Sequence, residues 1–247
     1  MEDHMESYKS KWVIAIIGFI LLCNTIRIAI AYDVIPVEDG GELSGTIKLR
    51  GELPQIMPLK VDRDPAYCGT TVPDNSLIIN PANKGIENVV VSLEGIHQGK
   101  KHAPEILVLE NTKCHFEPHI LAGVVEDLLE IKNSDPVMHN THLRLEGEGT
   151  ILNMALPPGI NPIRKSLTTA GMINANCDAH RFMKARILVF DHPYFSVTGK
   201  NGEFKISNIP PGHYKIKVWH EMLPVKEQEV TIAANGKTDL SLELNLK

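Results

Sequence analysis

Residues 194–221 read YFSVTGKNGEFKISNIPPGHYKIKVWHE, and this stretch decides the fold class. Tyr214, Ile216 and Val218 alternate with lysines. Successive side chains of a β-strand point to opposite faces, so the pattern predicts a strand with one buried and one solvated face. GKNG and IPPG are turn sequences that separate this strand from its neighbours. The stretch therefore predicts a small antiparallel β-sandwich segment.

The same period of two recurs along the chain after Tyr32. It is seen in ELSGTIKLRGELP (42–54), ENVVVSLEGI (87–96), EILVLENTKC (105–114) and VVEDLLEIKNSDP (124–136), and in the alternating leucines at 240–246. Gly, Pro and Asn separate these short runs, and no window of twelve residues in this part carries a helical stripe. Short strands spaced by turn residues predict an all-β protein built as a sandwich or barrel.

The C-terminal segment resembles the transthyretin-like, carboxypeptidase-regulatory type of domain. Thr198, Gly202 and Phe204 give its T-x3-G-x-F pattern, and the turn at 210–214 gives its P-x-G-x-Y pattern. The resemblance covers about residues 190–247 and implies a β-sandwich without chemistry of its own. Residues 42–95 are candidates to supply partner strands to that sandwich.

The N-terminal residues have the plan of a secretory signal. Two lysines precede the apolar run WVIAIIGFILLC (12–23), and Ala29 and Ala31 form an A-x-A site before Tyr32. Arg27 lies late for such a segment, so an uncleaved membrane anchor through residues 12–31 is the alternative. In both cases the chain from about residue 32 is expected outside the cytoplasmic membrane, periplasmic or extracellular.

Charge and cysteine content narrow the function classes. The 247 residues carry a formal net charge of -5, which argues against a nucleic-acid partner. Beyond the predicted signal lie Cys68, Cys114 and Cys177, an odd number for an oxidising compartment. If Cys177 binds a metal, Cys68 and Cys114 are the expected disulfide. The alternative is that Cys177 pairs with one of the other two and the third thiol is buried.

Residues 176–185, NCDAHRFMKA, place three soft or borderline metal donors within seven positions: Cys177, His180 and Met183. Copper electron-transfer sites use two imidazoles and a thiolate with a weak axial thioether. The missing imidazole is expected upstream in NSDPVMHNTH (133–142), after a strand. His139 and His142 compete for this role, and alternation puts them on opposite faces of an extended segment, so both are not expected to bind one ion.

The HN pair after a strand and the downstream C-x2-H-x2-M loop resemble the cupredoxins, the small blue copper proteins, with a loop of the amicyanin type. The resemblance covers about residues 88–191 and implies a Greek-key β-sandwich holding one copper ion that cycles between Cu(I) and Cu(II). It implies His139, Cys177 and His180 as equatorial ligands and Met183 as the axial ligand. It also implies that Asn140 braces the cysteine loop, and that His180 is the ligand nearest solvent and the electron port.

These features predict four segments: 1–31 as signal peptide or anchor, 32–87 as an N-terminal β segment, 88–191 as a cupredoxin-like copper domain, and 192–247 as a transthyretin-like β-sandwich. The expected function is single-electron transfer to an unidentified redox protein. The alternatives are a periplasmic copper carrier without a redox partner and a structural β-sandwich that recognises a ligand. No catalytic motif is present, so the chain is not expected to be an enzyme. A second metal site among His115, His119 and His142 stays open.

Overall fold

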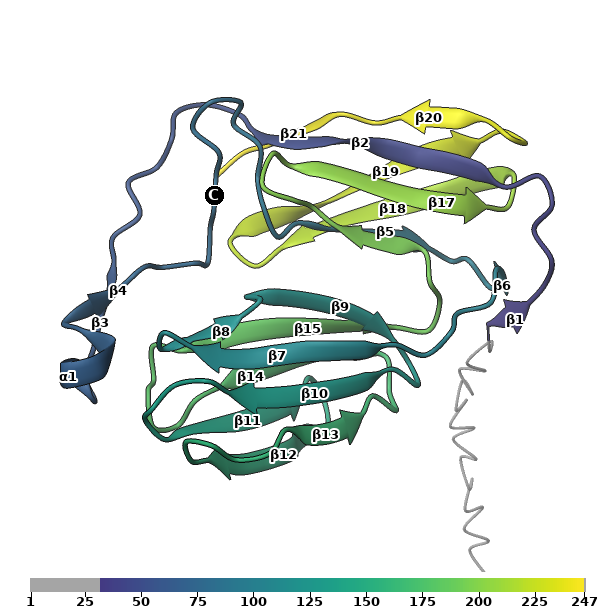
Figure 1. Ribbon diagram of the computed structural model, residues 1–247. Helices are drawn as coiled ribbons and strands as arrows, with labels where there is room; N and C mark the ends of the chain where they lie inside the picture. The colour runs from purple at the N-terminus through teal and green to yellow at the C-terminus, as the bar shows by residue number, and fades with distance from the viewer. Residues whose placement is uncertain (1–31, 247) are drawn as a thin grey trace, which may run out of the picture. The chain divides into compact units, whose positions relative to one another are not determined.

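The computed structural model describes residues 32–246, and nearly all of its regular structure is β-strand (Figure 1). The predicted all-β class is thus confirmed. The predicted signal segment, residues 1–31, lies outside the described residues. Within residues 32–246, no helix has the length and hydrophobicity needed to cross a bilayer.

One β-sandwich, called here the central sandwich, is built from the contiguous stretch 106–190 (Figure 1). Its first sheet has the order β13-β10-β7-β8 and its second the order β12-β11-β14-β15-β9. The bounds are β7 (Ile106–Thr112), β8 (His115–Glu117), β9 (Ile120–Val124), β10 (Leu128–Asn133), β11 (His139–Leu145), β12 (Gly149–Leu156), β13 (Ile163–Ser166), β14 (Gly171–Asn176) and β15 (Lys184–Phe190).

The core of the central sandwich forms because alternate residues of facing strands point inward. In β11, His139, Thr141 and Leu143 are fully buried. Leucine and isoleucine side chains of β10 and of β14–β15 belong to the same apolar cluster. Two strand pairs are parallel, β7 with β10 and β9 with β15. The chain therefore crosses between strands as well as turning back by hairpins.

A second sandwich, called here the composite sandwich, combines strands from both ends of the described chain (Figure 1). One sheet has the order β16-β5-β18-β19, and the other has the order β17-β2-β20, with β21 also paired to β2. The bounds are β2 (Gly41–Leu49), β5 (Val90–Glu94), β16 (Phe195–Val197), β17 (Glu203–Ile209), β18 (Gly212–His220), β19 (Leu223–Ile232), β20 (Lys237–Asp239) and β21 (Leu242–Leu244).

The strand groups of the structure differ from the predicted segments. Residues 42–95 do supply partner strands to the C-terminal segment, because β2 pairs with β17 and β5 pairs with β16 and β18. Strand β5 lies in the range 88–191 that was expected to form the copper domain, yet its partners are all in the composite sandwich. The reason is that the C-terminal strands alone leave gaps in both sheets, which β2 and β5 fill.

The segment that connects β2 to β5 includes residues 59–72, which are called here the strap. It contains β3 (Leu59–Lys60), α1 (Pro65–Cys68) and β4 (Thr71–Val72), with β3 and β4 paired antiparallel. Cys68 of the strap forms a disulfide with Cys114 of the β7–β8 turn, with a Cα–Cα distance of 5.7 Å. The remaining pair, β1 (Asp33–Val34) and β6 (Gln98–Gly99), is parallel.

His220 ends β18 and is buried, with 3% of its surface exposed. Burial lowers the pKa of His220 to about 4, even though the neighbouring Glu221 charge acts in the opposite direction. An unfolded histidine titrates near pH 6.5. Between these two values the unfolded chain binds a proton that the folded chain does not, so acid weakens the fold.

We therefore predict that the free energy of unfolding falls as the pH drops from 6.5 toward 4. Between pH 7 and pH 4.5, the titration of His220 should lower the free energy of unfolding by about 2 kcal/mol. Urea denaturation of wild type and of His220→Gln at pH 7 and pH 4.5 measures it. The loss should be smaller in the variant by that amount. His213→Gln, at an exposed histidine of the same strand, is the control and should keep the wild-type pH dependence.

Candidate metal centre

The candidate site lies where two neighbouring strands of the central sandwich meet a loop. β11 and β14 are antiparallel neighbours, so the start of β11 at His139 and the end of β14 at Asn176 lie at the same end of the sheet. Cys177 follows β14 directly, and a tight turn leads to β15. In that turn the Met183 amide donates to the His180 carbonyl oxygen at 2.9 Å. The turn holds the predicted ligands close together.

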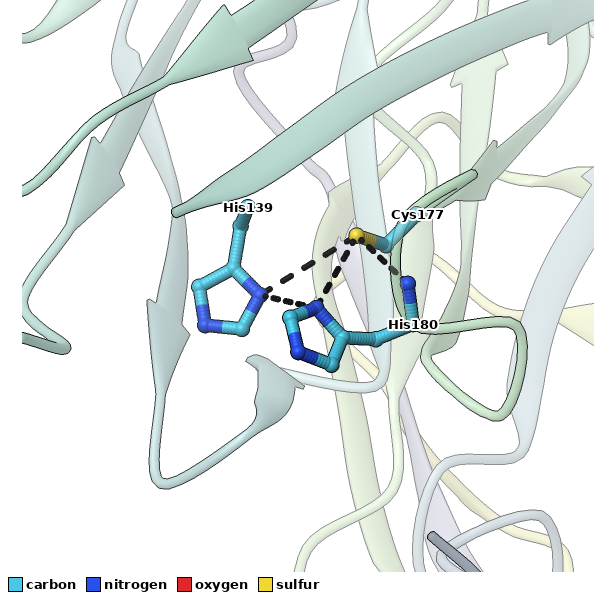
Figure 2. Close-up of side chains that lie close together, drawn as sticks. All are labelled: His139, Cys177 and His180. Atoms are coloured by element: carbon cyan, nitrogen blue, oxygen red, sulfur yellow. Dashed lines mark hydrogen bonds between the residues drawn. The ribbon is translucent and has the colours of Figure 1, made fainter. Parts of the chain in front are cut away.

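Three of the four predicted ligands converge (Figure 2). His139 Nδ1 lies 3.1 Å from His180 Nδ1, and Cys177 Sγ lies 4.0 Å from His139 Nδ1 and 3.7 Å from His180 Nδ1. All three residues are buried, with at most 1% of their surface exposed. Figure 2 shows the two rings and the sulfur pointing toward one another across a small gap.

The size of this triangle suits a single metal ion. Bonds of about 2.0 Å to nitrogen and about 2.3 Å to sulfur, as zinc makes them, place N and S about 3.7 Å apart at an angle of 120°. Of the two observed N–S distances, 3.7 Å matches that value and 4.0 Å is slightly longer. The residues therefore fit an ion held by two imidazoles and a thiolate, without the side chains having to move far.

The outer nitrogens of both imidazoles are fixed by carboxylates. His139 Nε2 donates to Asp135 Oδ2 at 2.8 Å, and His180 Nε2 donates to Asp64 Oδ2 at 2.9 Å. A neutral imidazole that carries its proton on Nε2 has a lone pair on Nδ1. Both Nδ1 lone pairs then face each other at 3.1 Å, an arrangement that requires a proton or a metal ion between them.

Asp135 is the better anchored of the two carboxylates. It accepts hydrogen bonds from the amides of Lys113 and Cys114, from the Tyr67 hydroxyl and from His139. Burial alone would raise the pKa of Asp135, but these hydrogen bonds outweigh burial and hold the pKa below its ordinary value. Burial also lowers the pKa of His139, against the influence of Asp135. His139 is therefore a neutral imidazole beside an ionised carboxylate, the form in which imidazole binds a metal.

Cys177 is free and buried. Burial raises the pKa of its thiol, so the protein alone does not favour the thiolate. The amides of Asn140 and His180 lie 3.4 Å from Sγ, and they favour the thiolate in part. A bound cation would supply the remaining stabilisation, since a coordinating thiol is deprotonated.

Asn140 makes contacts with the cysteine loop and with the neighbouring strand. Its side-chain oxygen accepts a hydrogen bond from the Asp178 amide, in the ligand loop. Its own amide points at Cys177 Sγ. Its side-chain nitrogen donates to Asn153 Oδ1 at 2.6 Å on the neighbouring strand. Asn140 thus ties the cysteine loop to both β11 and β12.

The fourth predicted ligand, Met183, is buried and lies in the same apolar cluster as Cys177. His142 is on the opposite face of β11, as the alternation predicts, and contacts Asp178 and Thr150. His115 and His119 join no triad of donor atoms among the described residues. A second convergent group does exist, Cys114 with Asp135 and His139, but Cys114 is tied up in the disulfide and offers no thiolate.

The predicted exposure of His180 is wrong. No part of its surface is exposed, because the strap covers its outer edge and places Asp64 against Nε2. Sequence reasoning did not identify Asp64 or Asp135 as partners of the imidazoles. Asp135 lies only four residues before His139, so a contact between them could have been predicted from the sequence. Asp64 lies 116 residues from His180, and no local pattern marks it.

A family model described as "Polysaccharide lyase family 4, domain II" matches residues 190–240. This match replaces the transthyretin-like resemblance predicted for the same segment, and it agrees with the β-sandwich seen there. The residues that carried the resemblance lie around the turns on either side of β17, and turn residues of this kind occur in many β-sandwiches. No curated relative matches the chain in sequence.

Solved structures similar to this chain include copper proteins. A Cu-containing nitrite reductase from Thermus scotoductus SA-01 is 22% identical over 38% of this chain, with a TM-score of 0.33. The match spans 24% of that enzyme. Amicyanin from Paracoccus versutus is 16% identical over 34% of this chain and 80% of its own, with a TM-score of 0.31. A reduced amicyanin variant is 23% identical over 34% of this chain and 81% of its own, with a TM-score of 0.31.

Proposed function

We propose that this chain binds one copper ion through His139, Cys177 and His180, with Met183 as the weak axial ligand, and passes single electrons. The observation that carries the proposal is the triangle of Nδ1, Nδ1 and Sγ, which is buried and has the dimensions of a three-ligand metal site. Thiolate and imidazole together suit copper in both of its oxidation states. Bound copper would supply the Cu(I)/Cu(II) couple.

The protein residues would keep the ligands in place during that change. Both imidazoles are held at their outer nitrogens by Asp135 and Asp64. Cys177 is held by two amides, and Asn140 ties its loop to the sheet. A site whose ligands are fixed in this way needs little rearrangement when the charge of the ion changes, because the supporting hydrogen bonds are already made.

The proposed function implies an exported protein with a redox partner. The predicted signal segment and the disulfide fit an exported protein in an oxidising compartment. The partner would be a redox protein, and the chain itself would act without catalysis. The burial of all three ligands favours electron transfer over copper delivery, since a carrier must release its ion to an acceptor.

The first test is addition of one equivalent of Cu(II) to the purified protein, with its visible spectrum recorded. An intense thiolate-to-copper band, removed by ascorbate and restored by ferricyanide, is the expected result. Slow loss of copper to an external chelator is expected as well. Fast loss would favour the carrier function, and a pale solution without bound copper would leave a structural β-sandwich protein.

A further inference from the structure

The strap brings a carboxylate to the outer edge of the candidate ligand His180. Asp64 Oδ2 accepts a hydrogen bond from His180 Nε2 at 2.9 Å, and the side chain of His180 is completely buried. The backbone of Asp64 is left-handed, with φ 52° and ψ 44°. This conformation costs free energy for a non-glycine residue, so the surrounding structure must hold it in place.

The strap is fastened to the central sandwich at several points. Cys68 is bonded to Cys114 at the β7–β8 turn. The Tyr67 hydroxyl donates to Asp135 Oδ1 at 2.8 Å. Val61 and Val72, on either side of α1, are buried in the apolar cluster that also contains Cys177. Asp64 lies between these fastenings, so its position is set by the strap as a whole.

The strap therefore acts on both imidazoles, on one by a direct hydrogen bond and on the other through a residue outside the strap. It reaches His180 directly through Asp64, and it reaches His139 through Tyr67 and Asp135. Asp64 differs from Asp135 in having 38% of its side chain exposed and in lying 3.7 Å from Arg63. Because Asp64 contacts a fully buried ring, its interaction with His180 differs from an ion pair between two exposed side chains.

We infer that Asp64 is a positioning residue for His180, and that the strap, by holding Asp64 there, closes the centre against loss of its ion. This inference rests on the proposed metal function. A carboxylate at Nε2 fixes the tautomer in which Nδ1 is free to bind, orients the ring and makes the imidazole a stronger donor. The added negative charge near the ion favours Cu(II) over Cu(I), so Asp64 also lowers the reduction potential.

Two substitutions separate the contributions of Asp64. Asp64→Asn keeps an oxygen acceptor of similar shape and removes the charge. Asp64→Gly removes the contact and accepts the left-handed backbone without strain. Asp62→Asn is the matched control, because Asp62 is an exposed acid two residues away on the same strap. Circular dichroism and a free-thiol count establish that each variant folds and keeps its disulfide.

Each protein would be titrated with Zn(II), loaded with Cu(II), challenged with an external chelator and measured for reduction potential. Asp64→Gly is expected to bind Zn(II) about tenfold more weakly or worse, the usual effect of losing a residue that supports a ligand, and to release Cu(II) faster by a similar factor. Asp64→Asn should raise the potential with a smaller change in Zn(II) affinity. Asp62→Asn should match wild type in all measurements.

The outcomes distinguish this inference from the proposed function. If wild type binds neither Zn(II) nor Cu(II), the proposed function fails and the inference falls with it. If wild type binds both ions and the two Asp64 variants match Asp62→Asn in affinity, release rate and potential, the inference alone is overturned. Should Asp64→Gly not fold, Asp64→Asn still decides the question through the potential.

Discussion

Replacing Cys177 by serine is expected to abolish the intense visible band of the copper-loaded protein. The band arises from charge transfer between a thiolate and Cu(II), and Cys177 is the one thiol in residues 32–246 that is not in a disulfide. A serine hydroxyl is a harder and more weakly acidic ligand than a thiol, and copper sites of the proposed kind depend on a soft thiolate. The visible spectrum, with the bound copper counted by elemental analysis, measures both effects.

A histidine substitution makes the result specific to the site. His139→Gln should weaken copper binding as well, because it removes one corner of the triangle and leaves the buried Asp135 without its ring partner. His213→Gln, far along the chain in the composite sandwich, should keep the wild-type spectrum. A Cys177→Ser protein that keeps both the band and the copper stoichiometry would rule out the proposed ligand set.

Removal of the Cys68–Cys114 disulfide is expected to lower the free energy of unfolding by about 4 kcal/mol, the chain-entropy value for a loop of this size. The two cysteines are 46 residues apart, and the bond joins the strap to the β7–β8 turn. Without it, the unfolded chain gains freedom that folding must remove. Urea denaturation of the metal-free Cys68→Ala/Cys114→Ala variant against wild type measures the loss, and the absence of metal keeps ligand binding out of the comparison.

Reduction provides the control for this measurement. A dithiol reductant should move the wild-type midpoint toward that of the double variant and leave the double variant unchanged. Equal midpoints for oxidised wild type and the double variant would mean that the disulfide adds nothing to the stability of the protein. Cys177→Ala, which keeps the disulfide, shows whether loss of a buried cysteine as such explains the change.

Local sequence patterns predict the strands and most of the residues that meet at the candidate site. The alternation in β18 predicts its buried face, because burial of one face of a strand imposes a period of two. The spacing of Cys177, His180 and Met183 depends on one turn of chain, and the HN pair at 139–140 follows one strand. Candidate ligands that lie on one short loop can thus be predicted from residues that are close together in the sequence.

Features that depend on distant partners could not be predicted in this way. The parallel pairing of β7 with β10 and the entry of β2 between β17 and β20 depend on which surfaces remain to be covered after other strands have packed. The outer edge of His180 is covered by Asp64 of the strap, which lies 116 residues away in the sequence. The local sequence around a histidine does not show whether the outer edge of its ring faces water or a carboxylate.

The arrangement of the composite sandwich has a consequence for the order of folding. Strands β2 and β5 are made before the central sandwich, and the strands that pair with them, β16, β17, β18, β20 and β21, are made after it. The central sandwich, contiguous over 106–190, can complete its own strand pairs while the chain is still emerging. The composite sandwich can form only after residues 195–244 have been made, and until then β2 and β5 have unpaired edges, so this interval is the period of greatest aggregation risk.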